Sequence, residues 1–563
     1  MKSKIMKFPY ILGFSLALSV ALSSYAAPVL PSSADAGRLI SEEKISPFEN
    51  SDKEVFIPKS VVLKEMPEAV KNIKFILKEV KIEGMTVFTT DAIKDIYIKD
   101  LNQEVSLAIA WEIANKITTR YRNEGYFLSR AYIPEQKIKD GTIKINIIEG
   151  YIAEIELPED MQNNKVIKTY ADKLLKTRPA TIDKVEEFVL KVNDLPGYSC
   201  RSVLSPIDKE NFEGEGIKLT LVKTDKKSRG MISYDNNSSR YLGINEVSSS
   251  YSTSLLPMHQ TTISGMSSLP TDKSNYGGID HLVVLAPDLT LGLSASTTKT
   301  YPGYTLDTYD IDSSANSMGM SLNYQWIRQR QENLSTKFML NSINVTSNIL
   351  GTALTRDHVR VLRSGFIYNK DDKWQGQNQV DFTLSRGIAG LGSSQTNDLY
   401  LSRISAKPNF TKAELSLSRT QEIYNEWSAF IATSGQYTSN SLYSSEQFGY
   451  GGQNFGRAYD PSEITGDKGI KAVLELRYSG LDFSKELKVQ PFSFYDIGSV
   501  TDNHVSNSTY SAASAGLGIR FATIWNQNCS IGVAWPLTKD ISTPIYGTNH
   551  RSPRFMMQFS QSF

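Results

Sequence analysis

The stretch Leu289-Thr290-Leu291-Gly292-Leu293-Ser294 alternates apolar residues with small or polar ones. The same period of two returns in Val380-Asp381-Phe382-Thr383-Leu384-Ser385 and in Ala413-Glu414-Leu415-Ser416-Leu417-Ser418. Because the side chains of a strand point alternately to its two faces, each stretch predicts a strand with one apolar and one polar face. A soluble sandwich packs its apolar faces together, whereas a membrane barrel turns them to lipid. The alternation alone leaves both architectures open.

The chain ends on a strand of the same kind, Phe555-Met556-Met557-Gln558-Phe559-Ser560-Gln561-Ser562-Phe563. One face of this strand carries Phe555, Met557, Phe559 and Phe563. A terminal strand that ends in Phe resembles the signal that barrel-assembly machinery reads in outer-membrane proteins. Phe563 is therefore the candidate assembly signal, and this end of the chain favours the barrel.

The first residues predict export from the cytoplasm. Lys2, Lys4 and Lys7 precede an apolar run from Ile11 to Leu22, and Ser24-Tyr25-Ala26 places small residues at a cleavage site. This pattern is typical of a signal peptide, here residues 1–26. An N-terminal membrane anchor is the alternative, but the run is short for a bilayer core of about 30 Å.

A barrel also agrees with the length of the C-terminal part. No later stretch offers the roughly 18 uncharged apolar residues of a transmembrane helix, and closed barrels are the other structures that cross lipid. Residues 225–563 would allow about 16 strands, at roughly 21 residues for each strand and its connection. We therefore expect a transmembrane antiparallel β-barrel of about 16 strands in this region.

Composition excludes several classes of function. The net charge of +1 argues against a general nucleic-acid binder. Cys200 and Cys529 lie far apart, with no metal-ligand spacing around either. With five histidines and no Gly-x-Ser-x-Gly or His-Glu-x-x-His motif, the sequence contains no catalytic constellation. We expect no enzyme activity, no metal and no cofactor.

Composition changes near residue 225, from Lys- and Glu-rich to Ser-, Thr-, Tyr-, Asn- and Gly-rich. Before this point we expect three segments. Residues 27–72 form a polar leader with a short helix from Ala34, which Ser33 or Asp35 could cap, and then a linker. Complete disorder of this leader is the alternative. Residues 73–150 and 151–224 form two α+β units of similar size.

The first unit shows the clearer pattern. A helix is indicated by apolar residues at spacings of three and four, namely Leu107, Ala110, Ala114, Ile117 and Tyr121. Asp140-Gly141 predicts a hairpin turn before the alternating strand Ile143 to Ile147. In the second unit, Val185, Phe188, Val189 and Val192 indicate a helix that ends at Leu195-Pro196-Gly197.

Several motifs resemble those of a known family. Glu124-Gly125-Tyr126, Ala131, Pro134, Gln136, Gly141 and Ile147-Ile148-Glu149-Gly150 resemble the POTRA domain of two-partner secretion transporters. These form the ShlB/FhaC/HecB haemolysin secretion/activation family, a branch of the Omp85 superfamily. Leu195-Pro196-Gly197 resembles a turn of the family's second POTRA domain, and Asp235-Asn236-Asn237 resembles its first barrel strand.

The most specific resemblance is to the family's long loop, which folds back into the barrel and has a Val-Arg-Gly-Tyr/Phe tip. The matching segments are Glu446 to Gly452, Phe455-Gly456-Arg457-Ala458-Tyr459 and Gly466-Asp467-Lys468-Gly469. This chain has Gly456 in place of Val and Ala458 in place of Gly, and a lost glycine narrows the backbone conformations open to the tip.

The barrel-strand motif Phe494-Tyr495-Asp496-Ile497-Gly498 resembles the family motif whose aspartate pairs with the loop arginine. The resemblance therefore implies a pair between Arg457 and Asp496 that locks the loop to the barrel wall. Phe455, Gly456, Ala458 and Tyr459 would form the loop tip around Arg457. A buried guanidinium needs such a partner, and a carboxylate can accept two of its hydrogen bonds.

The resemblance implies an outer-membrane pore with periplasmic POTRA domains that bind an unfolded exoprotein and pass it to the cell surface. The exoprotein would carry an N-terminal secretion domain and add to an exposed sheet edge of the first unit, including the strand Ile143 to Ile147. The leader helix would plug the pore. Outer-membrane lipid and the barrel-assembly machinery are the other expected partners, and nucleic acid is not one.

Three alternatives remain open. An Omp85-type assembly factor would insert other barrels into the membrane and usually carries a different set of POTRA units. A diffusion porin would need no periplasmic docking units. A barrel-anchored enzyme such as a lipase would need catalytic motifs that this sequence lacks.

Overall fold

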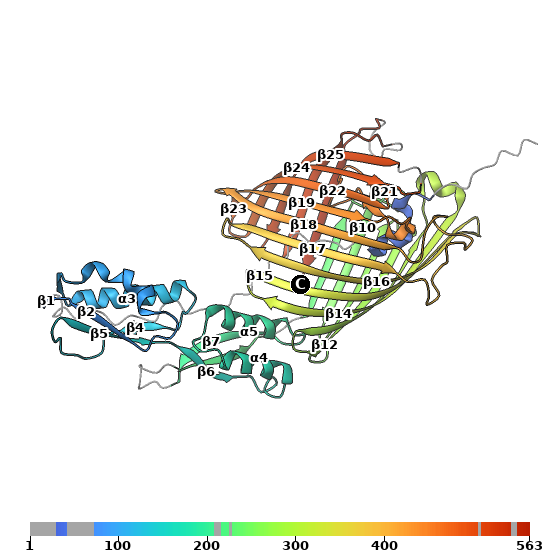
Figure 1. Cartoon of the computed structure of the whole chain (residues 1–563). Coiled ribbons are helices and arrows are strands. Elements are labelled where there is room, and N and C mark those ends of the chain that lie inside the picture. The colour runs from blue at the N-terminus through green and yellow to red at the C-terminus, as the bar shows by residue number, and fades with distance from the viewer. Residues whose placement is uncertain (1–29, 42–72, 208–215, 225–227, 505–507, 542–548) are drawn as a thin grey trace, which may run out of the picture.

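The computed structural model describes residues 30–41, 73–207, 216–224, 228–504, 508–541 and 549–563. Two small α+β units lie at one end of a large barrel, and a short N-terminal helix lies inside the barrel toward its other end (Figure 1). The expected signal peptide and most of the linker to residue 72 lie outside the described residues. Among those residues, no helix is long and apolar enough to span a bilayer.

The C-terminal part is a closed antiparallel barrel of 16 strands. β23 continues β22, and both pair with β24. The strands are β9 (Arg229–Asp235), β10 (Asn245–Thr253), β11 (His259–Leu269), β12 (Ser274–Ala286), β13 (Leu289–Thr300), β14 (Ile311–Arg328), β15 (Glu332–Ile349), β16 (Thr352–Asp371), β17 (Gly376–Gly387), β18 (Thr411–Tyr424), β19 (Trp427–Tyr437), β22 (Lys468–Tyr478) with β23 (Leu481–Ser484), β24 (Leu487–Thr501), β25 (Thr509–Thr523), β26 (Gln527–Pro536) and β27 (Arg554–Ser562).

Rows of side chains across β13, β14 and β15 show which face of the barrel is apolar. Leu293, Met320 and Leu340 pair across these strands and are 46 %, 48 % and 43 % exposed. The adjacent row holds Ser294, Gly319 and Asn341. Apolar side chains thus point outward and polar ones point into the lumen, which is the arrangement of a membrane barrel. The sandwich alternative is excluded.

Exposed tryptophans mark one rim of the barrel. Four of the six tryptophans lie at or beside strand connections on the side of the α+β units, namely Trp326, Trp374, Trp427 and Trp525. Two of them pack against tyrosines, edge-on in Tyr324–Trp326 and tilted in Trp427–Tyr478, with ring centroids 4.6 Å and 4.9 Å apart. Such aromatic girdles lie at the membrane–water interface, so this rim marks one boundary of the membrane, on the side of the α+β units.

The first α+β unit comprises β1 (Lys74–Ile76), β2 (Glu79–Glu83), α2 (Thr90–Ile93), β3 (Glu104–Ser106), α3 (Ala108–Asn123), β4 (Arg130–Tyr132) and β5 (Thr142–Ile148). The predicted stripe of α3 is buried, from Ala110 to Tyr121, and it packs against the sheet. Asp140 and Gly141 have φ of 54° and 78°, as a hairpin turn requires.

One expectation for this unit is wrong. The sheet order is β2-β5-β4, so the strand Ile143 to Ile147 is central and its backbone pairs on both sides. This strand therefore has no free backbone edge to which an unfolded exoprotein could add. The outer strands of this sheet are β2 and β4. β2 pairs with β5 in parallel, although the two strands lie far apart in the sequence, and β4 pairs with the other side of β5.

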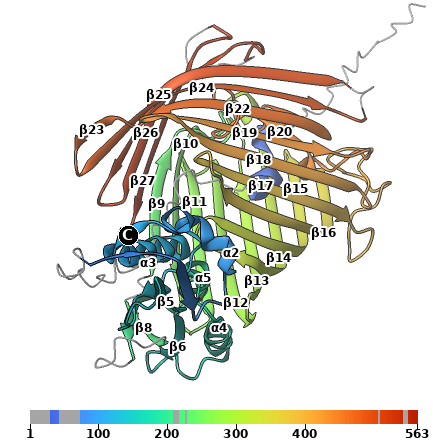
Figure 2. The same ribbon diagram turned by 60° about the vertical axis from the view of Figure 1, so that its left-hand side comes forward.

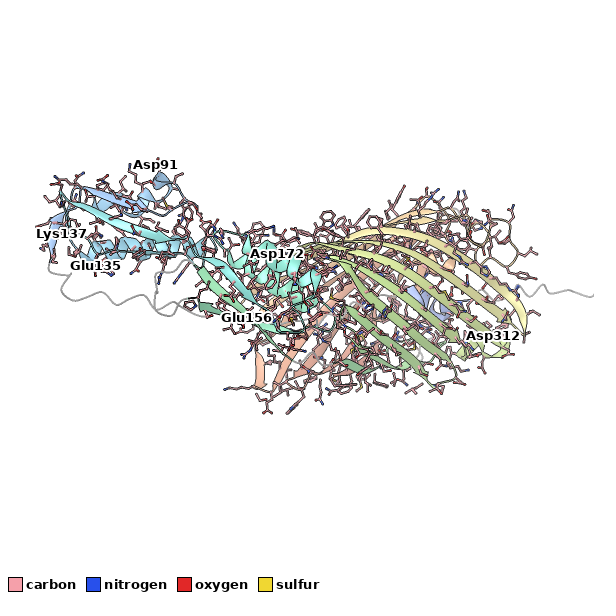
Figure 3. All side chains as sticks on the ribbon, turned by 90° about the horizontal axis from the view of Figure 1, so that it is seen from below. Asp91, Glu135, Lys137, Glu156, Asp172 and Asp312 are labelled. Atoms are coloured by element: carbon pink, nitrogen blue, oxygen red, sulfur yellow. The ribbon has the colours of Figure 1, made fainter. Side chains whose placement is uncertain are left out.

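The second unit comprises β6 (Tyr151–Glu156), α4 (Lys165–Leu175), α5 (Ile182–Asp194), β7 (Cys200–Pro206) and β8 (Gly216–Lys223), with sheet order β6-β8-β7. α5 is the predicted helix. α4 is additional, and Asn164 caps it by accepting hydrogen bonds from the N–H groups of Val166 and Ile167. Charged side chains project from both units, including Asp91, Glu135 and Lys137 on the first and Glu156 and Asp172 on the second (Figure 3).

A buried charge cluster joins the second unit to the barrel. Lys191 of α5 lies 3.0 Å from Asp288, in the connection between β12 and β13, and both side chains are 7 % exposed. The Tyr170 hydroxyl also donates to Asp288. Burial would lower the pKa of Lys191, but Glu187 and Asp288 raise it above its usual value. The charged pair therefore persists and orients this unit on the tryptophan-bearing rim of the barrel.

Glu149, in the POTRA-like motif Ile147-Ile148-Glu149-Gly150, has a structural role within the first unit. Its carboxylate accepts hydrogen bonds from the Thr86 N–H (2.8 Å), the Val87 N–H (2.9 Å), the Thr86 hydroxyl and the Tyr121 hydroxyl (2.7 Å). Burial by itself would raise the pKa of Glu149, but the hydrogen bonds from Thr86, Tyr121 and Val87 lower it overall. The carboxylate thus ties the end of the sheet to α3 and to the residues before α2.

Glu149→Gln is expected to destabilise the first unit by about 1 kcal/mol at neutral pH, because the bonds to a partly solvated carboxylate weaken. A lowered pKa in the folded state adds stability above the unfolded pKa, and this stability is lost as pH falls through the folded pKa. The difference between variant and parent should therefore vanish in acid. Urea titrations of the full chain, followed by helical circular dichroism, measure this. Glu124→Gln, an exposed control in the same unit, should have little effect at either pH.

Candidate functional site

Residues 438–467, between β19 and β22, form a loop that folds back into the barrel; we call it the inserted loop. It contains the short hairpin of β20 (Phe448–Tyr450) and β21 (Ile464–Gly466), which lies within the barrel beside the N-terminal helix (Figure 2). This is the loop that the sequence motifs predicted. Buried charges join it to the barrel at several places.

Arg457 lies at the tip of the inserted loop and contacts two strands. Its backbone N–H, Nε and Nη2 donate to the two oxygens of Asp496 in β24 at 3.0–3.1 Å. Nη1 donates to Glu475 in β22 at 2.8 Å. The guanidinium also lies over the Phe494 ring, 3.5 Å from its centroid. Arg457 is 9 % exposed and Asp496 is fully buried, so the structure brings the two residues together in a water-poor environment.

Glu475 is a third member of this site that sequence reasoning missed. Besides Arg457, it accepts hydrogen bonds from Arg477 of β22 (2.7 Å) and Arg520 of β25 (2.6 Å). One carboxylate thus joins Arg457 of the loop tip to two arginines of the barrel wall. The sequence could have suggested it as an acidic residue at a lumen-facing position of a strand, but many charged residues share that property.

The backbone conformation of the loop tip explains why its glycine lies before the arginine, where the family pattern has valine. The left-handed conformation falls on Gly456, with φ of 79°, where the family has Val. A Cβ at Gly456 would lie 2.8 Å from the Tyr450 ring, so a side chain would be excluded. Ala458 has no positive φ and is buried. In this chain the glycine has therefore moved to the position before the arginine.

The other tip residues anchor the loop by packing. Tyr459 is fully buried, and its hydroxyl lies 3.0 Å from the carbonyl of Ala513 in β25. Phe455 is also buried, with Lys471 Nζ 5.0 Å from its ring centroid. Both belong to an apolar cluster with residues of the barrel wall, including Phe492 and Val500.

Asp460 joins the inserted loop to the closure of the barrel. Its carboxylate accepts from Arg240 Nε (2.6 Å), in the connection after β9, and from Arg554 Nη1 (2.9 Å) in β27. Asp460 is fully buried, and both arginine side chains are 4 % exposed. β9 and β27 are the first and last strands of the barrel. The loop therefore bridges the junction at which the barrel closes.

The closing junction is short. β27 and β9 pair over five residue pairs, from Gln558↔Asp235 to Ser562↔Met231, whereas β15 and β16 pair over eighteen. The predicted first-strand motif ends β9 at Asp235, and Asn236 extends the junction by bonding the backbone of Phe555 and Met557. The final residue, Phe563, exchanges two backbone hydrogen bonds with Gly230.

The N-terminal helix α1 (Ala36–Ser41) follows the 3₁₀ turn η1 (Ser32–Ala34) and lies against the inserted loop. Asp35 caps it by accepting from the Gly37 N–H at 2.8 Å, as one of the two expected capping residues. Arg38 donates to the carbonyls of Ser444 (2.8 Å) and Gln447 (3.2 Å) in the inserted loop. Gly37 lies so close to Val345 of β15 that a Cβ would approach to 2.7 Å. α1 thus occupies space between the loop and the wall.

Comparison with known proteins gives matches along most of the chain. Residues 217–521 match the family model described as haemolysin secretion/activation protein ShlB/FhaC/HecB. Residues 75–150 match the model of the ShlB-type POTRA domain.

Curated relatives and solved structures agree with these matches. The heme/hemopexin transporter protein HuxB of Haemophilus influenzae (strain 86-028NP) is 25 % identical over 552 residues, 94 % of each chain. The outer membrane transporter CdiB of Dickeya dadantii (strain 3937) is 21 % identical and covers 82 % of this chain and 83 % of its own. The structure of CdiB from Escherichia coli, 16 % identical, superimposes with a TM-score of 0.65 over 90 % of this chain and 93 % of that chain. BamA from Haemophilus ducreyi lacking POTRA domains 1–3, 12 % identical, gives 0.51 over 87 % and 100 %.

Proposed function

Because this chain belongs to the haemolysin secretion/activation family ShlB/FhaC/HecB, we propose that it exports its partner by exchanging α1 for the client while the inserted loop stays anchored. The chain is an outer-membrane transporter of two-partner secretion, with POTRA units in the periplasm. Its partner is a secreted exoprotein. The proposal concerns how the pore opens for that partner.

The observation that carries the proposal is the contrast between the two segments in the lumen. The inserted loop is held by buried ion pairs at Arg457 and Asp460, which reach β22, β24 and β27 as well as the connection after β9. α1 has six residues, packs closely through Ala36 and Gly37, and bonds the inserted loop through Arg38, which donates to the carbonyls of Ser444 and Gln447. Freeing the inserted loop would break several buried ion pairs at once, which is costly, whereas displacing α1 leaves the pairs of Arg457 and Asp460 intact.

The client would enter from the POTRA units in an unfolded state. We propose that it carries an N-terminal secretion domain and adds as an extra strand to an outer strand of a POTRA sheet, such as β2 or β4. Backbone pairing suits an unfolded client because it depends little on side-chain identity. The barrel itself would reach the membrane through the barrel-assembly machinery, with Phe563 in the terminal signal.

Two deletions test the roles of these parts. Removing residues 73–224 should abolish secretion of the partner exoprotein, although a diffusion porin would keep its activity. Removing residues 27–50 should raise single-channel conductance, because α1 no longer fills the lumen. Unchanged conductance after the second deletion would count against α1 as a plug, and continued secretion after the first would count against POTRA-dependent export.

An assembly factor of the Omp85 type is the competing function, and BamA shares the fold. Crosslinking during export separates the two. A secretion transporter should trap one large secreted protein at its POTRA units, whereas an assembly factor should trap many barrel proteins.

A further inference from the structure

Residues 388–410, between β17 and β18, form a segment at the barrel end opposite the POTRA units; we call it the exit segment. One side of it faces the interior of the barrel. Leu401 and Ala406 are 9 % and 0 % exposed, in an apolar cluster shared with Ala36 of α1 and with Leu442 and Tyr443 of the inserted loop. The exit segment therefore packs in one core with both segments that fill the lumen.

Hydrogen bonds join the exit segment to its surroundings. The Ser402 N–H donates to Asp357 of β16 at 3.0 Å, and the Ser444 N–H donates to the Ser402 hydroxyl at 3.1 Å. The Tyr443 hydroxyl donates to the Ser394 carbonyl at 2.9 Å. The wall and the inserted loop thus both hold the segment in this position.

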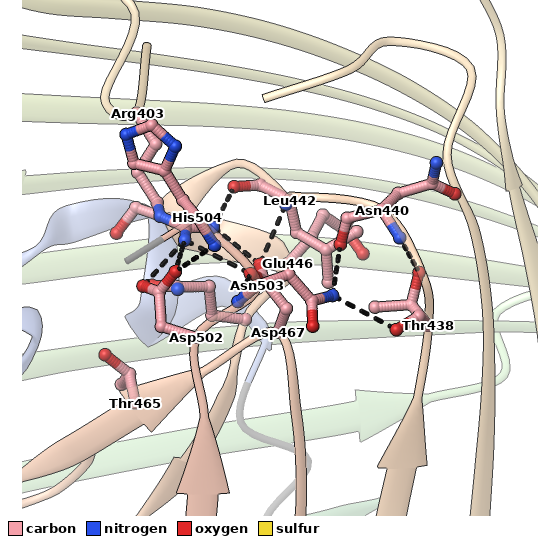
Figure 4. Close-up of polar contacts among 12 residues, drawn as sticks. Arg403, Thr438, Asn440, Leu442, Glu446, Thr465, Asp467, Asp502, Asn503 and His504 are labelled. Atoms are coloured by element: carbon pink, nitrogen blue, oxygen red, sulfur yellow. Dashed lines mark hydrogen bonds and ion pairs between the residues drawn. The ribbon is translucent and has the colours of Figure 1, made fainter. Parts of the chain in front are cut away.

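The strongest contact of the exit segment is made by Arg403 (Figure 4). Its Nη1 lies 2.5 Å from Asp467 Oδ1, and its Nη2 lies 3.2 Å from Asp467 Oδ2 and 2.7 Å from Asp502 Oδ1. Nη1 also donates to the Leu442 carbonyl at 2.7 Å. Asp467 ends the inserted loop and Asp502 follows β24. One guanidinium therefore connects the exit segment to two other extracellular connections.

Asp467 belongs to the motif Gly466-Asp467-Lys468-Gly469, and this motif takes no part in the contact between Arg457 and Asp496. Its carboxylate is fully buried and also accepts from the backbone N–H groups of Leu442 (2.9 Å) and Asn503 (2.8 Å). These two bonds remain if Arg403 departs, so Asp467 keeps hydrogen-bond donors. The Arg403 side chain is 13 % exposed and can regain water. The contact is thus suited to open and close.

We propose that the exit segment is a lid over the extracellular mouth of the pore and that Arg403 is the clip that holds it shut. Leu401 and Ala406 pack in the same cluster as α1, so departure of α1 removes part of the lid's apolar support. Arg403 then supplies the lid's ion pairs, beside the hydrogen bonds that Ser394 and Ser402 make with β16 and the inserted loop. Plug release and lid opening are then coupled steps. The proposed lid rests on the export function proposed above, and the experiments below distinguish failure of the lid from failure of the export function.

Arg403→Ala should open the lid without disturbing the barrel. In planar bilayers, the full chain should open about ten times more often, the change that loss of about 1.4 kcal/mol gives. Arg386→Ala is the matched control, since Arg386 flanks the same segment, is exposed, and donates to the exposed Thr411 hydroxyl. Heat-modified mobility in gels verifies that both variants are folded. Equal opening of Arg403→Ala, Arg386→Ala and the parent would overturn the clip.

A reversible cross-link tests the lid itself. Ser402→Cys and Ser444→Cys are combined in a chain whose Cys200 and Cys529 are replaced by Ser, and a short bis-maleimide serves if no disulfide forms. Closing the link should stop secretion, and reduction of the disulfide should restore it, while each single cysteine has no effect. Secretion by the linked protein at the parent rate would refute the lid. Absence of secretion in the cysteine-free parent would instead count against the export function.

Discussion

Arg457→Ala is expected to abolish secretion while the barrel still assembles. The substitution removes the guanidinium that holds the loop tip to Asp496 and Glu475, and leaves two buried carboxylates with fewer donors. Breaking one partner of a buried pair costs about 3–5 kcal/mol, which shifts the anchored loop toward the released state by a factor of 100 or more. Secretion of the exoprotein into the medium measures the loss, and heat-modified mobility verifies the barrel.

Two variants make this result specific. Arg477→Ala removes another arginine from Glu475, but Arg477 belongs to β22 and does not hold the loop, so secretion should continue. Arg457→Lys keeps the positive charge but loses the bidentate contact with Asp496, so we expect secretion between that of Arg457→Ala and that of the parent. Normal secretion by Arg457→Ala would remove the loop lock from the proposed function.

Asp460→Ala is expected to cause the largest loss of barrel stability, about 3–5 kcal/mol. The carboxylate is fully buried and is shared by Arg240 and Arg554, at a junction where β27 and β9 pair over only five residue pairs. Without it, two buried guanidinium groups repel each other at the seam. The temperature at which the folded barrel converts to its unfolded gel mobility should fall.

Glu463→Gln is the matched control for Asp460. Glu463 also contacts Arg240, at 3.3 Å, but it is 13 % exposed and is paired with Lys539 at 2.8 Å. Its loss should lower the conversion temperature less than the loss of Asp460. If Asp460→Ala and the parent convert at the same temperature, the loop does not stabilise the closing junction. The short pairing of β9 with β27 is then enough to keep the barrel closed.

The candidate site was only partly predictable. Arg457 and Asp496 were named from motif resemblance, and the structure places them in direct contact. Glu475, Asp460 and Asp467 were not singled out as partners, because an acidic residue in a strand or a loop has the same local sequence pattern whether it faces water or a buried arginine. Gly456 was read as a departure from the family tip, and its φ of 79° shows that it is a requirement of this tip.

The error in the first POTRA unit has a similar origin. The alternation of Ile143, Ile145 and Ile147 correctly predicted a strand with one buried face. Alternation describes the two faces of a strand and carries no information about its two edges. Whether β5 lies at the edge depends on β2, more than fifty residues earlier, which pairs with it in parallel.

The amino-acid sequence by itself determined the alternating strands and the presence of two α+β units, because each of these depends on periodicities within short segments, but the alternation did not decide which face of the strands turns outward. The tertiary structure decided which charges meet. Asp460 lies 220 residues from Arg240 and 94 from Arg554, and these side chains come together only when the barrel closes. Burial then makes their contacts strong, since a charge removed from water depends on its partner. The anchored loop and the closed exit segment follow from this three-dimensional arrangement.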